Sequence, residues 1–235
     1  GPVGPQGDTG VPGSATNTGA TGPTGQIGPT GRFGTLSALN SDVQVTGTTT
    51  AYTVGIGGGA TGTNSIVITR GSGALDNGFY SVALGYLAGN YAQLQQSVAI
   101  GHNAGNTGQR NQAIAIGSYA GQNNQSGGAV ALGYIAGNSN QGNYATALGY
   151  NSGNTNQGLN SIAIGPNAGS LNQGTYSIAI GQSAGYTGQV NDAVAIGRNA
   201  GYYNQGQGSI CMGYQAGNTG QGNNAIAIGR NAGQY

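Results

Sequence analysis

A pattern of small, branched apolar and glycine residues recurs every 16 residues through most of the chain. Copies follow one another without insertion and begin at Ser81, Ser97, Ala113, Ala129, Ala145, Ser161, Ser177, Ala193, Ser209 and Ala225. A weaker copy begins in the same phase at Ser65, and we interpret residues 65–80 as a degenerate cap on the array. A fixed short period predicts stacked structural units, each completed by its neighbour.

The first four residues of each copy, such as SIAI, alternate as a β-strand does. The second and fourth positions are branched or long apolar residues, except for Thr146. The first and third are Ser or Ala, except for Cys211. We interpret the branched face as the interior of a coil and the small face as a surface packed closely against a neighbouring subunit. The candidate trimer-interface residues are Ala163, Ala179, Ala195 and Cys211.

Glycines at the fifth and ninth positions of each copy predict a turn that needs unusual dihedral angles or close backbone approach. The variable positions between them, such as Asn167, are expected to tolerate substitution. The structural turn glycines singled out here are Gly85, Gly89, Gly101, Gly105, Gly165, Gly169, Gly181 and Gly185.

A glutamine stands at the thirteenth position of nine successive copies. In stacked coils about 4.8 Å apart, such amides would form a ladder in which each bonds the next. The alternative interpretation is a solvated turn. The predicted ladder includes Gln141, Gln157, Gln173, Gln189 and Gln205.

These features together predict an all-β fold, a parallel β-solenoid (β-roll) of 16-residue coils that spans residues 65–235. Faithful copying keeps each ladder in register.

Residues 1–34 follow a different rule, with glycine at every third position except at Thr16. This register predicts a collagen-like triple helix, because only glycine fits at the axis of three polyproline-II chains. The alternative is a disordered Gly/Pro linker. The GPT triplets resemble those of bacterial and viral collagen-like proteins, and this resemblance implies O-glycans on threonines of the segment. Residues 35–64 are then a connector or adaptor.

Composition excludes several classes of function. Only 4% of the residues are charged, lysine is absent and the five arginines are scattered, so nothing predicts binding to a nucleic acid. No apolar run approaches the roughly 18 residues of a membrane span. The chain does not begin with methionine, and we expect it to be processed or to be a piece of something longer.

Catalytic and metal-binding chemistry finds little support in the residues. The only histidine, His102, occupies a variable turn position, and Asp76 and Asp192 lie about seven coils apart. There is no Cys/His cluster. Cys211 replaces an alanine and is expected to behave as a small buried apolar residue. We interpret GIGGGATG at residues 55–62 as a linker or turn, since no lysine follows it. We therefore predict a non-enzyme without cofactor or metal.

The phrases SVAIG, SIAIG and AVAIG, each followed by a turn of small residues, resemble the head repeats of trimeric autotransporter adhesins such as YadA. The resemblance implies a parallel β-roll with three chains around a threefold axis. The repeat here is about two residues longer than is usual in that family, residues 1–235 contain no recognisable coiled-coil stalk or membrane anchor, and the collagen-like segment precedes the repeats. The head-like repeats and the collagen-like segment each imply a homotrimer.

Two functions follow. The first is a structural subunit of an extracellular or surface fibre, which in one form stacks head to tail into a filament. The second is an adhesin or a viral fibre that binds a host receptor or matrix ligand through the β-roll surface. Tyrosines at variable positions are either contact residues or solvated turn residues. They are Tyr86, Tyr134, Tyr150, Tyr186, Tyr202, Tyr203 and Tyr214.

Overall fold

A computed structural model describes residues 53–56, 65–68 and 78–234. The chain divides into two units, Gly1–Gly47 and Thr48–Tyr235, and all described residues belong to the second. The predicted collagen-like segment 1–34, with its threonine glycans, and most of the connector 35–64 lie outside the described residues.

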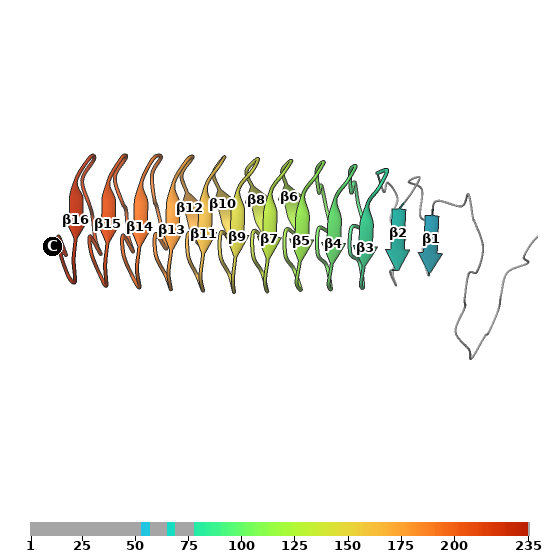
Figure 1. Ribbon diagram of the computed structural model, residues 1–235, viewed down its shortest axis with the longest axis horizontal. Helices are drawn as coiled ribbons and strands as arrows, with labels where there is room; N and C mark the ends of the chain where they lie inside the picture. The colour runs from blue at the N-terminus through green and yellow to red at the C-terminus, as the bar shows by residue number, and fades with distance from the viewer. Residues whose placement is uncertain (1–52, 57–64, 69–77, 235) are drawn as a thin grey trace, which may run out of the picture. The chain divides into compact units, whose positions relative to one another are not determined.

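The second unit is a parallel β-solenoid, as the 16-residue period predicts (Figure 1). The first four residues of each copy contribute one strand to a large sheet of twelve parallel strands. From residue 65 onward each strand pairs with the next at an offset of one repeat, so that Ala163 lies beside Ala179 and Ala179 beside Ala195. The strands, in spatial order, are β1 (Thr53–Ile56), β2 (Ser65–Ile68), β3 (Val82–Leu84), β4 (Val98–Ile100), β5 (Ile114–Ile116), β7 (Val130–Leu132), β9 (Thr146–Leu148), β11 (Ile162–Ile164), β13 (Ile178–Ile180), β14 (Val194–Ile196), β15 (Ile210–Met212) and β16 (Ile226–Ile228).

The opposite wall of the coil is a small sheet of four parallel strands. Each of these strands ends at the glutamine of the thirteenth position. They are β6 (Asn123–Gln125), β8 (Ser139–Gln141), β10 (Thr155–Gln157) and β12 (Leu171–Gln173). Single parallel bridges, such as Tyr91 to Thr107 and Tyr203 to Thr219, continue this wall in both directions. The described residues contain no helix.

The N-terminal part of the large sheet differs from the sequence prediction. Gly55 and Ile56, which we assigned to a linker or turn, belong to β1, and β1 pairs in register with β2. Strand β2, in the degenerate copy, pairs with β3. Strand pairing therefore reaches beyond the predicted start at residue 65, because backbone hydrogen bonding requires no particular side chains.

The two faces of the large sheet are reversed relative to the sequence prediction. The alanines at the third position, with Cys211, are fully buried within the isolated chain. The branched residues at the second and fourth positions are half-buried or exposed on the outside. The physical reason is the narrow interior, where the alanines face an alanine of the eighth position and a glutamine from the opposite wall. Beside the glutamines a branched side chain would overfill this space, and the one buried branched residue at this position is Val67 of the degenerate copy.

Ala163, Ala179, Ala195 and Cys211 are therefore core residues of the coil, and their assignment to a subunit interface is corrected. The alternation of a strand identifies two faces but does not say which one points inward.

Corners with positive φ close each coil. Position 5 is always glycine, with φ between 116° and 130°, and position 9 is always glycine, with φ between 50° and 56°. All eight turn glycines named above fall in these two groups. Position 7 also has positive φ in every copy, and asparagine, which tolerates this conformation, stands there in half of the copies. Asn167 is one of these, so it is more constrained than a freely variable site.

Replacing Gly165 with alanine should destabilise the fold by about 1–3 kcal/mol or more. Its φ is 116°, and an added Cβ would lie 2.9 Å from the carbonyl carbon of Gly181 in the next coil. Thermal or chemical unfolding followed by circular dichroism measures the loss. Gly222→Ala is the matched control, because a Cβ there meets nothing within 4 Å and φ is outside the left-handed region. Equal stability of the two variants would refute the corner geometry.

Candidate interaction surface

The glutamines of the thirteenth position form a row inside the coil. Their side chains are between 0% and 2% exposed from Gln93 to Gln205, so they are not solvated turn residues. The Nε2 of Gln141 donates hydrogen bonds to the carbonyl oxygen of Val130 at 2.8 Å and to that of Ala145 at 3.2 Å. Because these carbonyls belong to the opposite wall, each amide joins the two walls of the solenoid.

Amide-to-amide hydrogen bonds connect only part of this row. In three places the Nε2 of one glutamine donates to the Oε1 of the glutamine in the next coil, at 3.1–3.2 Å. The pairs are Gln109 to Gln125, Gln125 to Gln141 and Gln141 to Gln157. Gln173, Gln189 and Gln205 still donate to backbone carbonyls of the opposite wall. Their Oε1 atoms are buried without a hydrogen-bond partner. The wall-to-wall bond is thus the constant feature of the row.

Replacing Gln141 with methionine should lower the free energy of unfolding by about 1–3 kcal/mol. Methionine has a similar length but cannot donate to Val130 or Ala145, and it removes the side-chain acceptor of the Gln125 amide. Denaturant unfolding measures the difference. Gln182→Met on the exposed corner is the control and should stay within about 0.5 kcal/mol of the parent.

The outer face of the large sheet carries an apolar stripe, which we define as the residues at the second and fourth positions together with Ile66 and Ile68. Ile66, Ile68, Leu84, Leu132, Leu148 and Met212 are between 37% and 46% exposed in the isolated chain. Thr146 is the only polar member between β2 and β16. A continuous exposed apolar surface of this kind marks a site of contact with another protein, a membrane or a ligand. The strand alternation alone does not reveal this surface, because these residues were predicted to lie inside the coil.

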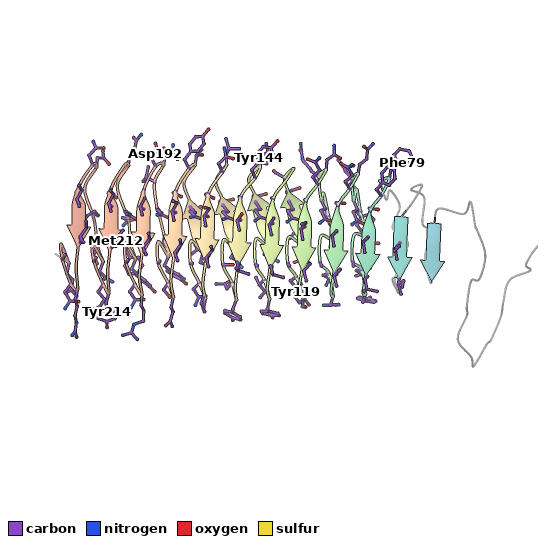
Figure 2. All side chains as sticks on the ribbon, viewed as in Figure 1. Phe79, Tyr119, Tyr144, Asp192, Met212 and Tyr214 are labelled. Atoms are coloured by element: carbon purple, nitrogen blue, oxygen red, sulfur yellow. The ribbon has the colours of Figure 1, made fainter. Side chains whose placement is uncertain are left out.

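Two edges border the stripe. We call the corner before each strand, at positions 15 and 16, the N-edge, and the corner after it, at positions 6 and 7, the C-edge. Figure 2 shows Phe79, Tyr144 and Asp192 on the N-edge. Tyr119 and Tyr214 lie on the opposite C-edge, and Met212 lies between the edges on β15.

Stacked rings follow the C-edge. The ring of Tyr86 stacks on His102 at a centroid distance of 5.4 Å, and His102 meets Tyr119 edge to face at 4.9 Å. Tyr134 and Tyr150 stack at 5.7 Å. Towards the C-terminal coils, the guanidinium of Arg198 lies over the ring of Tyr214 at 4.5 Å. The exposed tyrosines of this edge are therefore ordered by their neighbours.

A second tyrosine group lies at positions 10 and 11. Tyr186 and Tyr202 stack at 4.9 Å, and Tyr202 meets Tyr203 edge to face at 4.3 Å. Burial raises the pKa of Tyr202, and its hydrogen bond with Tyr203 raises it further. The phenol of Tyr202 therefore remains neutral at physiological pH.

The described residues offer no clear centre for metal or acid–base chemistry. No group of three or more His, Cys, Asp or Glu side chains occurs among them. His102 lies exposed on the C-edge and Asp192 exposed on the N-edge, seven coils from Asp76 in sequence. No described helix is long and apolar enough to cross a membrane.

Cys211 is buried at a position that alanine occupies in the other nine copies. Burial raises the pKa of its thiol to about 11. Because the thiolate is the reactive form, the folded protein keeps this cysteine unreactive at neutral pH.

Cys211 should resist alkylation by iodoacetamide at pH 8 in the folded protein and react once the protein is unfolded, as measured by intact mass. The raised pKa also predicts that folding stability falls as pH rises from about 9 towards 11, since only the unfolded chain readily loses this proton. Cys211→Ala should remove that part of the pH dependence. A folded protein that is alkylated as fast as the unfolded chain would contradict the burial.

Comparison with known proteins supports the architecture. Residues 157–184 match the YadA head domain repeat in two copies. No match was found among curated proteins or solved structures. The matched residues run from β10 to the corner after β13. They point to a surface protein resembling trimeric autotransporter adhesins, and head repeats of this kind associate as trimers in general.

Proposed function

We propose that this chain is a non-enzymatic structural subunit of an extracellular or surface fibre, and that three copies assemble around an axis parallel to the solenoid. The observation that carries this proposal is the apolar stripe, which follows the large sheet from β2 to β16. Water exposure of so long an apolar surface is unfavourable by about 25 cal/mol per Å². A second and third copy of the same chain offer matching stripes of equal length.

The dimensions of the coil suit a threefold arrangement. The stretch from position 1 to position 5 is about 16 Å wide at ~3.3 Å per residue. Three such faces closed into a triangle would lie about 5 Å from the axis, which is half of the ~10 Å spacing of packed sheets. Branched side chains would fill the centre, and no second layer would be needed.

The adhesin interpretation is the second candidate, and the exposed C-edge favours it. Stacked Tyr134 and Tyr150 are 46% and 55% exposed, and tyrosine provides contact area at low entropic cost. A host receptor or matrix ligand would then bind the outside of the trimer.

The collagen-like segment and the ends of the trimer would extend the fibre in two ways. A collagen-like triple helix of residues 1–34 with O-glycans on threonine would provide a stalk with the same threefold symmetry. Stacking of trimers head to tail would extend the fibre. Electron microscopy of the native assembly distinguishes continuous filaments from separate spikes, and separate spikes would reject the filament.

Ile164→Glu combined with Ile180→Glu should convert trimers into folded monomers, because six carboxylates would surround the axis without partners. Light scattering should show one third of the parent mass, with unchanged circular dichroism. Leu171→Glu, an apolar-to-acidic change at a 37% exposed site on the other wall, should leave the trimer intact. A parent chain that is monomeric would overturn the proposal.

Ala179→Leu tests the inner face of β13, whereas Ile180→Glu tests the outer face of the same strand. The leucine would overpack the inside of the coil, so we expect it to lower folding stability by about 1–3 kcal/mol rather than to dissociate subunits.

A further inference from the structure

We infer that Asp192 of one subunit forms an ion pair with Arg198 of the next, and that this pair closes the trimer at the level of β14. The inference rests on the proposed trimer and names a specific contact within it.

Asp192 is the only carboxylate side chain among the described residues, and it is exposed. It is the residue of the N-edge that directly precedes the copy containing β14. Its backbone N–H donates to the carbonyl oxygen of Thr175, and this bond holds it at the corner. Figure 2 shows it pointing away from the strands.

Arg198 stands at the other end of the same strand. It is exposed, and its guanidinium lies 4.5 Å from the ring centroid of Tyr214, which Figure 2 shows on the C-edge. The ring restricts the guanidinium to one side and leaves its N–H groups free to bind a carboxylate. Within one chain the width of the sheet, about 16 Å, keeps the two charges apart.

Cyclic symmetry brings these two edges together. When three flat faces close around a threefold axis, the C-edge of each subunit meets the N-edge of the next, because a cyclic interface is heterologous. Because a threefold rotation involves no shift along the axis, each strand lies at the same height as the same strand in the other two subunits. Asp192 and Arg198 flank β14, so they are level across the subunit boundary.

The other described arginines do not share this level. Arg230 is on the C-edge two coils further on, about 10 Å away along the stack. Arg110 is at position 14, five coils earlier. The charge pattern therefore selects Arg198 as the partner of Asp192.

Charge reversal in mixed subunits tests this contact. Asp192→Arg alone and Arg198→Asp alone should each place like charges at all three boundaries and lower the trimer melting temperature by about 2–6 °C. When the two single variants are refolded together, mixed trimers regain opposite charges at two boundaries. Native mass spectrometry should show mixed trimers in excess of the random proportion.

Arg230→Asp is the matched control, because Arg230 also lies over Tyr214, at 5.7 Å, yet faces no described acid at its level. Refolded with Asp192→Arg, it should give no such excess. If a reversed chain did not fold, a double-mutant cycle with Asp192→Asn and Arg198→Gln would measure the same coupling. A trimeric parent whose variants mix at random, or show no coupling, would refute the ion pair and leave the trimer standing. A monomeric parent would refute both.

Discussion

The width of the coil interior governs the rest of the structure, and the buried glutamine amide fixes that width. Each amide reaches from the small sheet to carbonyl oxygens of the large sheet, so the two walls are held one side chain apart. Only a small residue fits beside the amide on the large sheet, and it is alanine in every full copy except for Cys211. The corner glycine of position 9 is needed for the same reason, since a Cβ at Gly137 would lie 2.6 Å from the Oε1 of Gln141.

A core this thin buries little apolar surface per coil, so backbone hydrogen bonding and close stacking stabilise the solenoid to an unusual degree. Residues in contact along the stack are copies of one another, as Gly165 and Gly181 are. A change at one corner is therefore felt by the adjacent coil. This dependence between neighbouring coils explains why the 16-residue sequence is repeated without insertion.

Stacking also explains the low charge content. A charge at any repeated position would have a like charge about 4.8 Å away in both directions, and such neighbours repel. The described charged side chains all lie outside the strands, and no two occupy the same position in adjacent coils. Tyr214 separates Arg198 from Arg230. Neutral asparagine can repeat, as in the exposed bonds from Asn124 to Asn140 and from Asn140 to Asn156.

The sequence by itself determined the period, the strand in SIAI, the corners at glycine and the position of the glutamine row, because these depend on local geometry repeated in register, whereas the burial of the glutamines came from the structure. Asparagine at positions 7 and 12 is a further signal of left-handed corners in the sequence. Only the tertiary structure decided which face points inward. Ala179 and Ile180 alternate equally well in either orientation, and the choice depends on the wall opposite, which a glutamine and a second alanine hold too close for isoleucine. The candidate interface moved to the branched face for that reason.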